Sequence, residues 1–329
     1  MCWLCNQYGN GDHWYFNPQN YARRLYKRRV KGARPKEGGE DPEGVAGRII
    51  EEAVEAKWKD PDHFEEKRQL ATQMARKYSV GQVVTLDEAM QIVEIASPLA
   101  LMSCICRKNI RARDERDERE YSCLGLGVGM FKWDRWPERY KGGVKFVTPK
   151  RARQWLERWS KRGLMQTIMT FGTPYIGGLC NCEDVDCLAV RWRLDYGIEM
   201  LMKSHYVAKV DFEKCTGCKD CLERCHFGSL KLEAPRHLVR VDAFSCYGCQ
   251  ACQFGCDHEA IRMVPRAGLP AVAQVWLERY GENGEVARKN KEALWRRAAI
   301  LSSPLIGTSA PPPSPARSAC RSARRRSSG

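Results

Sequence analysis

The sequence lacks any long apolar run. No uninterrupted apolar stretch of about 18 or more residues occurs in its 329 residues, so no transmembrane helix is predicted. No apolar leader follows Met1, so we expect no secretory signal there. Gly125, Gly127 and Gly129 lack the preceding strand and the spacing of a dinucleotide-binding loop, so no flavin or nicotinamide site is predicted. The absence of a membrane span and of a secretory signal predicts a cytoplasmic protein.

Acidic residues are missing from two segments of the chain. Between His13 and Lys36 there are eight Lys or Arg, and from Ser302 to Gly329 there are five Arg. These thirteen charges account for most of the net charge of +15, so the body between them is close to neutral. The aromatic and basic residues of the first segment favour docking to an acidic partner protein over binding to nucleic acid.

Cysteine, by contrast, is abundant, with 17 residues in the chain. In a reducing cytoplasm, such cysteines indicate metal binding or redox chemistry rather than disulfides. Eight of them lie in two runs, Cys215–Cys225 and Cys246–Cys256, that share the spacing C-x2-C-x2-C-x3-C. The flanking residues repeat as well, 31 positions apart, in Val210-Asp211 and Val241-Asp242. This internal repeat predicts two βα-like halves related by a pseudo-twofold axis.

The spacing within each run allows three thiolates to wrap one [4Fe–4S] cluster, while the fourth points to the other cluster. The first predicted cluster is bound by Cys215, Cys218, Cys221 and Cys256. The second is bound by Cys246, Cys249, Cys252 and Cys225. Zinc or disulfides are the alternative, but zinc sites usually use pairs of cysteines rather than triplets.

With these two runs, residues 205–265 resemble the bacterial-type ferredoxin domain that holds two [4Fe–4S] clusters. The resemblance implies a low-potential electron carrier. Where that family usually has Pro after each fourth Cys, this chain has His226 and Asp257. We hypothesise that His226 couples the potential of the nearby cluster to pH. The alternative is that His226 is a solvated loop residue.

Six further cysteines form a second candidate group: Cys104, Cys106, Cys123, Cys180, Cys182 and Cys187. Two predicted strand–helix units, at about 83–96 and 144–163, each lead to a C-x-C pair. Thr85 and Glu88 predict a capping box at the start of the first helix. Thiolates from separate pairs can share one metal centre. A third iron–sulfur cluster, a structural zinc ion and unmetallated reactive thiols all remain open.

Residues 83–191 also resemble a cysteine-rich module that precedes two-cluster ferredoxin domains in iron–sulfur proteins of anaerobes. The resemblance rests on Thr85-Leu-Asp-Glu-Ala, Cys104-x-Cys106-Arg107, Cys123-Leu-Gly-Leu-Gly and Gly178-Leu-Cys180-Asn-Cys182. It implies an iron–sulfur protein without defining the chemistry of the module. Arg107 is a candidate donor to cluster sulfur or substrate, or else part of an exposed salt bridge.

Near the start of the chain, Cys2, Cys5 and His13 are candidates for half of a metal site. The two cysteines either borrow ligands from elsewhere or hold nothing. The predicted fold class is α+β, with a C-terminal ferredoxin-like domain for two clusters and an N-terminal mixed α/β cysteine-rich domain. The predicted divisions are a basic aromatic segment (1–44), the six-cysteine module (45–200), the ferredoxin domain (205–265), C-terminal helices (266–301) and a disordered basic tail (302–329).

These features predict an iron–sulfur electron-transfer protein, or an electron-transfer subunit of a cytoplasmic oxidoreductase complex. A flavoprotein or another oxidoreductase subunit is the expected redox partner. One alternative is a cluster-dependent reductase whose active site lies in the six-cysteine module. Another is a redox-sensing nucleic-acid binder, which the near-neutral body of the chain disfavours.

Overall fold

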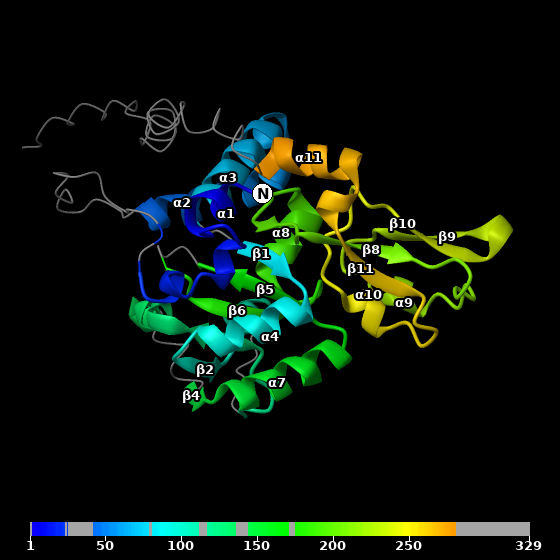
Figure 1. Cartoon of the computed structure of the whole chain (residues 1–329). Coiled ribbons are helices and arrows are strands. Elements are labelled where there is room, and N and C mark those ends of the chain that lie inside the picture. Colours follow the sequence, from blue (N-terminus) through cyan, green and yellow to red (C-terminus); the bar gives the residue numbers. More distant parts are fainter. Residues whose placement is uncertain are drawn as a thin grey trace, which may run out of the picture. The chain divides into compact units, whose positions relative to one another are not determined.

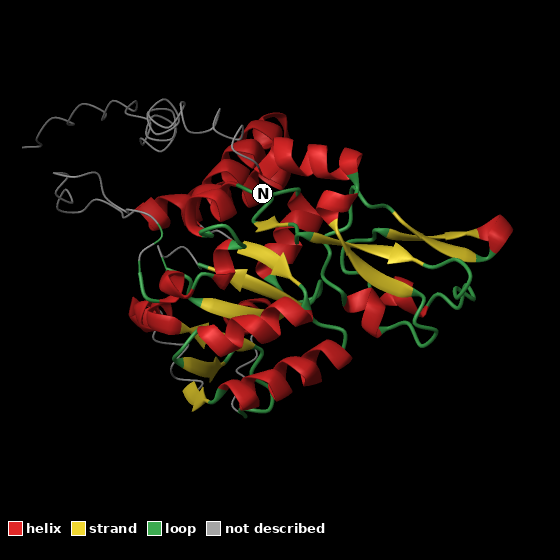
Figure 2. Cartoon of the chain, viewed as in Figure 1, coloured by secondary structure: helices red, strands yellow, loops and turns green. Residues whose placement is uncertain are grey.

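The structure, a computed structural model, describes residues 2–23, 25, 42–78, 81–111, 117–135, 144–170 and 175–280. Residues 281–301 of the predicted C-terminal helices and the predicted tail at 302–329 lie outside the described residues. Residues Met1–Glu285 form one compact unit of mixed α/β structure. Its large sheet and its two smaller sheets are visible side by side in Figure 2.

A seven-stranded mixed sheet forms the centre of this unit (Figure 1). In spatial order its strands are β4 (Val144–Val147), β2 (Leu99–Met102), β3 (Cys123–Leu126), β6 (Gly178–Cys182), β5 (Met165–Met169), β1 (Gly81–Val84) and β7 (Leu201–Met202). Neighbouring strands are antiparallel except β1 and β7, which run parallel. Sequence spacing predicted β1, β4 and the following helices, but it did not predict β2, β3 or β6.

Two helices, α4 (Leu86–Ile95) and α7 (Pro149–Lys161), lie side by side against this sheet (Figure 1). They follow β1 and β4, which confirms the two predicted strand–helix units. The capping box is also confirmed. The Thr85 hydroxyl accepts from the Glu88 backbone N–H at 3.2 Å, and the Glu88 carboxylate accepts from the Thr85 backbone N–H at 2.8 Å.

The sheet has one apolar face and one cysteine-rich face, because side chains alternate along each strand. Leu124, Ile168 and Leu179 face the core that α4 and α7 complete. Their strand neighbours Cys123 and Cys180 belong to the other face, where the side chains of Met102, Met165, Met169 and Cys182 also lie. The two residues of a C-x-C pair on β6 therefore share one face of the sheet.

The remaining helices surround the sheet and the segment before it. They are α1 (Trp3–Tyr8), α2 (Pro42–Lys59), α3 (Phe64–Tyr78), α5 (Ile105–Arg111), α8 (Leu188–Tyr196) and α11 (Pro270–Tyr280), with short 3-10 helices η1 (Trp14–Phe16), η2 (Pro18–Tyr21), η3 (Pro61–His63), η4 (Gly127–Arg135), η5 (Ala234–Arg236) and η6 (Arg266–Gly268). Helix α2 begins at Pro42, inside the segment 1–44 that we predicted to precede the six-cysteine module.

The cysteine repeat builds a small βαβ–βαβ arrangement. Its elements are β8 (Tyr206–Val210), α9 (Asp220–Glu223), β9 (Leu230–Glu233), β10 (Leu238–Val241), α10 (Ala251–Phe254) and β11 (Ile261–Pro265). The outer strands β8 and β11 pair antiparallel, and so do the inner strands β9 and β10. Each half begins alike, since Asp211 and Asp242 donate their backbone N–H to Ala260 and Ser229 respectively. The predicted internal repeat is thus a structural repeat.

Two equivalent glycines hold the cysteine loops close to neighbouring strands. Gly217 and Gly248 have φ of +70° and +72°. A Cβ atom at Gly217 would lie 2.0 Å from the His237 carbonyl oxygen, and one at Gly248 would lie 2.1 Å from that of Tyr206. Both the backbone conformation and the contact therefore require glycine.

We expect Gly248→Ala to destabilise the protein by more than about 2 kcal/mol, because strain and a backbone clash act together. Gly228→Ala is the matched control, since Gly228 also has positive φ (+63°) but a Cβ atom there would meet open space. That change should cost only about 1 kcal/mol. Thermal unfolding under anaerobic conditions measures both, and equal losses would contradict the close approach at Gly248.

Candidate functional site

The two cysteine runs line two separate cavities. The first cavity is lined by Cys215, Cys218, Cys221 and Cys256. The second is lined by Cys225, Cys246, Cys249 and Cys252. In each case three thiols come from one run and the fourth comes from the other run. The structure therefore brings together the two sets of four that the spacing grouped, called set I and set II below.

Backbone N–H groups point at several of these sulfur atoms. The Ser229 N–H donates to Cys225 Sγ at 3.1 Å, and the equivalent Ala260 N–H donates to Cys256 Sγ at 3.3 Å. Hydrogen bonds of this kind stabilise anionic sulfur and tune cluster potentials. Burial raises the pKa of the Cys249 thiol to about 12. A bound cation would favour the thiolate form of this buried thiol.

The residue after Cys225 is not a solvated loop residue, which corrects one of the two readings of His226. Its side chain is 8% exposed. Its Nδ1 lies 2.9 Å from Asp184 Oδ1, and its Nε2 lies 2.8 Å from the Gly163 carbonyl oxygen. His226 thus links the set II loop by hydrogen bonds to the segments that contain Gly163 and Asp184, beside the large sheet. Whether it couples a cluster potential to pH stays a prediction.

All six cysteines of the second candidate group meet in one closed ring of neighbouring thiols. The sulfur atoms of Cys123 and Cys180, which face each other across β3 and β6, lie 3.2 Å apart. Each thiol of the ring shifts the pKa of its neighbours, in the order Cys104, Cys106, Cys187, Cys182, Cys180, Cys123 and again Cys104. We call this arrangement the six-cysteine ring.

Different elements supply the six thiols. Cys123 and the pair Cys180 and Cys182 lie on the cysteine-rich face of the sheet. Cys104 and Cys106 lie at the start of α5, and Cys187 caps α8. Hydrogen bonds from neighbouring thiols, first that of Cys180, lower the pKa of Cys182 to about 6. In the same ring, hydrogen bonds with neighbouring thiols hold the pKa values of Cys106 and Cys180 well above their usual value, so a metal would have to displace their protons.

Set II packs directly against the six-cysteine ring. Cys249 and Tyr247 belong to the same apolar cluster as Cys123 and Cys180. The rings of Phe227 and Tyr247 stack with their centroids 3.8 Å apart, and both residues line the set II cavity. Two groups predicted separately from the sequence are thus neighbours in the fold.

Arg107 forms ion pairs beside the ring. Its guanidinium lies 2.8 Å from a Glu183 carboxylate oxygen and 3.3 Å from one of Asp186, and it stacks over Trp159. The Arg107 side chain is only 12% exposed, so its ion pairs are more buried than the exposed salt bridge that we gave as one alternative. The contacts join α5 to the loop between Cys182 and Cys187, and so support the ring.

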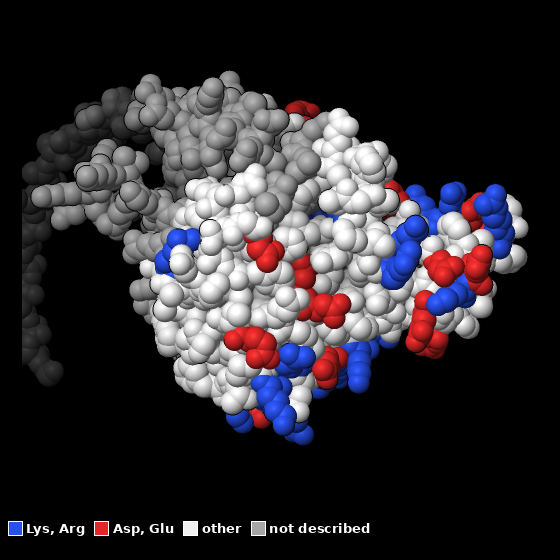
Figure 3. Space-filling view, viewed as in Figure 1, with Lys and Arg blue, Asp and Glu red and all other residues white. Residues whose placement is uncertain are grey.

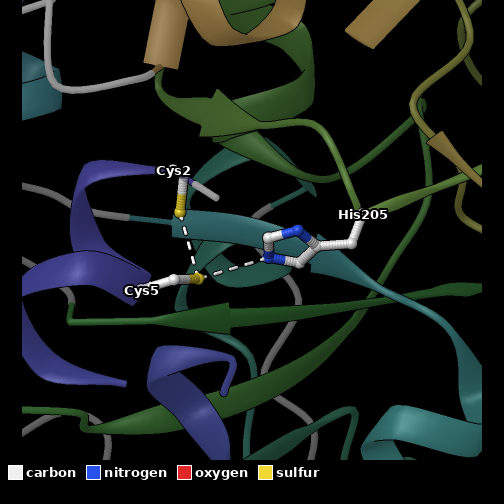
Figure 4. Close-up of side chains that lie close together, drawn as sticks. All are labelled: Cys2, Cys5 and His205. Atoms are coloured by element: carbon white, nitrogen blue, oxygen red, sulfur yellow. Dashed lines mark hydrogen bonds between the residues drawn. The ribbon is translucent and has the colours of Figure 1, made fainter. Parts of the chain in front are cut away.

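A third group lies where the N-terminal segment meets the junction of β7 and β8 (Figure 4). The sulfur atoms of Cys2 and Cys5 are 3.2 Å apart, and His205 Nε2 lies 3.5 Å from Cys5 Sγ. Both cysteines are fully buried. The predicted His13 is not the third donor, because its ring stacks on that of His205 and its Nδ1 contacts Tyr15 and Glu88. Sequence reasoning missed His205, which lies 200 residues from Cys5.

These groups differ in compactness. Of the residues that the structure describes, Cys2, Cys5 and His205 form the group whose donor atoms all lie within 4.8 Å of one another. A tetrahedral Zn²⁺ with bonds of about 2.3 Å needs sulfur donors roughly 3.8 Å apart. The ligands of a cluster bind different iron atoms, so they are spread more widely. Among the described residues, set I, set II and the six-cysteine ring contain no three donor atoms that all lie this close together.

Comparison with known proteins found no match to a family model, to a curated protein or to a solved structure. The chain is thus described as a cysteine-rich protein with a Cys2, Cys5 and His205 group. A search of the described helices for one of sufficient length and apolar character to cross a bilayer found none.

Proposed function

We propose that the chain is an iron–sulfur electron-transfer protein, or an electron-transfer subunit of an oxidoreductase complex. The observation that carries this proposal is the exchange of the fourth cysteine between set I and set II. Crossed ligation of this kind is typical of ferredoxins with two [4Fe–4S] clusters. Two zinc sites would not require the triplet spacing or the exchange.

The arrangement of strands supports the same proposal at the level of fold. In residues 205–265 the first strand pairs with the last and the two inner strands pair with each other, with a short helix in each half. This is the arrangement expected of a ferredoxin-like domain with two pseudo-symmetric halves. We infer that residues 205–265 form such a domain within the compact unit.

The exposure of the thiols suggests a direction for electron transfer. Cys218 of set I is exposed, whereas Cys246 and Cys252 of set II are buried. Set II in turn packs against the buried six-cysteine ring through Cys249 and Tyr247. Low-potential electrons would enter at set I from a flavoprotein or another oxidoreductase subunit, pass to set II and continue to a third centre in the ring.

Iron and acid-labile sulfide analysis of anaerobically purified protein, with EPR after dithionite reduction, tests this proposal. Two clusters correspond to about 8 Fe per chain and a third [4Fe–4S] centre to about 12. Spin coupling between two reduced clusters is expected because set I and set II are adjacent. Protein that holds fewer than about 4 Fe after anaerobic reconstitution would overturn the proposal.

A second candidate function is a cluster-dependent reductase with its active site at the six-cysteine ring. The observation that favours it is that the ring holds six thiols, more than a four-ligand cluster needs, beside set II. A substrate-dependent change in the spectrum of the third centre, with the paired signals unchanged, would distinguish this function from simple conduction.

The distribution of charge gives little support to a nucleic-acid binder. On the face shown in Figure 3, Lys and Arg are interspersed with Asp and Glu instead of forming one basic field. Nucleic-acid affinity depends on such fields. Salt-dependent binding to DNA or RNA that disappears on removal of residues 13–36 would revive this alternative.

Arg266 gives set II a buried positive charge, which leads to a prediction about potential. Its side chain is 2% exposed, and its guanidinium donates to the carbonyl oxygens of Ser204, Tyr206 and Cys246 at 2.8–3.0 Å. A nearby positive charge stabilises the reduced cluster, which carries one more negative charge. It should therefore raise the potential of the cluster at set II relative to that at set I.

We expect Arg266→Gln to lower the potential of the set II cluster by on the order of 50–100 mV. Two unit charges in a protein-like dielectric interact by roughly 1–3 kcal/mol, and about 1.4 kcal/mol corresponds to 59 mV for one electron. Arg262→Gln is the control, because Arg262 lies on the neighbouring strand β11 but is exposed. An EPR-monitored redox titration in which both variants shift alike would contradict the role of Arg266.

A further inference from the structure

The group of Cys2, Cys5 and His205 has the spacing of a site for a single metal ion. Its S–S and S–N separations are 3.2 and 3.5 Å, close to the donor spacing around a tetrahedral Zn²⁺ of roughly 3.5–3.8 Å. A disulfide would require sulfur atoms only about 2.05 Å apart. Two thiolates and one imidazole are also among the ligands that zinc prefers.

Burial makes a bound cation favourable here. Cys2 and Cys5 are fully buried and lie in the apolar core with Leu4 and Trp276. Two thiolates in such surroundings carry uncompensated negative charge, which is costly to bury. One divalent cation with two thiolates is electrically neutral, so the metal removes this cost.

The imidazole of His205 is held in place for binding. Its ring stacks on that of His13 with centroids 3.8 Å apart, and the ring of Trp276 packs against it edge-on with centroids 5.1 Å apart. Figure 4 shows its Nε2 directed at the sulfur of Cys5. Packing of this kind fixes the orientation of a ligand before the metal arrives.

The site also connects the N-terminal segment to the loop of set II. The backbone N–H of Arg266 donates to the carbonyl oxygen of His205 at 2.8 Å. The same residue donates through its guanidinium to the carbonyl oxygen of Cys246 at 3.0 Å. One buried arginine therefore bridges the backbone of a ligand at one site and that of a cysteine at the other.

We propose that Cys2, Cys5 and His205 bind one Zn²⁺ ion that clasps the N-terminal segment to the junction of β7 and β8. The three protein donors leave one tetrahedral position, which water fills in three-ligand zinc sites. The ion is separate from the iron of the electron-transfer proposal and does not depend on it. Its role is to fix the segment that precedes β8 and, through Arg266, the loop of set II.

Zinc and iron analysis of the anaerobically purified full-length chain, combined with zinc K-edge X-ray absorption, tests this proposal. We expect zinc at this site to show mixed sulfur and nitrogen ligation, with outer-shell scattering from imidazole. Absence of zinc, or zinc bound by sulfur alone, would overturn the proposal. Because this measurement uses the unaltered chain, it gives a decision even if a ligand variant does not fold.

Variants locate the ion. Cys5→Ser and His205→Gln should each remove one zinc per chain and leave the iron content unchanged. His13→Phe is the matched control, because His13 stacks on His205 without being one of the three donors. It should keep the zinc. Zinc that persists in both ligand variants would overturn this site. A parent protein that holds zinc but no iron would count only against the electron-transfer proposal.

Discussion

Combining Cys215→Ala with Cys256→Ala is expected to remove about 4 Fe per chain, no more than either change alone. Both cysteines line the set I cavity, although they come from different runs. Combining Cys215→Ala with Cys225→Ala should instead remove about 8 Fe, because these two residues of the same run line different cavities. Iron analysis after anaerobic reconstitution distinguishes the two results.

Ligation of one cluster by each run would give the opposite result. If each run bound its own cluster, the same-run pair would cost about 4 Fe and the cross-run pair about 8. EPR adds a second measure, since loss of either cluster should replace a spin-coupled spectrum by that of a single cluster. Cys320→Ala is the control for cysteine loss itself, because Cys320 belongs to neither set, and it should keep all the iron.

The second large effect is expected at the six-cysteine ring. Cys180→Ala should lower the metal content of the ring, by up to about 4 Fe for a cluster or one ion for zinc. The paired EPR signals of set I and set II should remain, because Cys180 lines neither cavity. The reason is geometric, since Cys180 links the thiols of Cys123 and Cys182 within the ring.

Leu179→Ala separates metal loss from a general loss of packing. Leu179 is the strand neighbour of Cys180, fully buried, and belongs to the opposite face of the sheet. Its truncation should destabilise the protein by about 2–5 kcal/mol without changing the metal content of the ring. If Cys180→Ala leaves the metal content unchanged, Cys180 is not a ligand of a third centre.

Local sequence patterns predicted much of the fold. The capping box of Thr85 and Glu88 could be predicted because its hydrogen bonds join residues three positions apart. The repeat of residues 210–261 could be predicted because both halves have the same glycines and cysteines. Strands β2, β3 and β6 could not, because each is only four or five residues long and is defined by pairing with distant segments.

The candidate sites show the same limit. Spacing grouped set I and set II, since the ligands of each run are near in sequence. It supplied the members of the six-cysteine ring but not their order, which depends on the register of β3 against β6. The sequence did not predict His205 as a donor, because only the packing of the N-terminal segment against the β7–β8 junction brings it close to Cys5.

The exposure of Cys218 has a consequence for damage. A cluster that a partner protein can reach is also one that dissolved oxygen can reach. With clusters in both sets, oxidation should begin at set I and advance inward, so that the buried set II and the ring are lost last. A protein handled in air should then lose the set I cluster first.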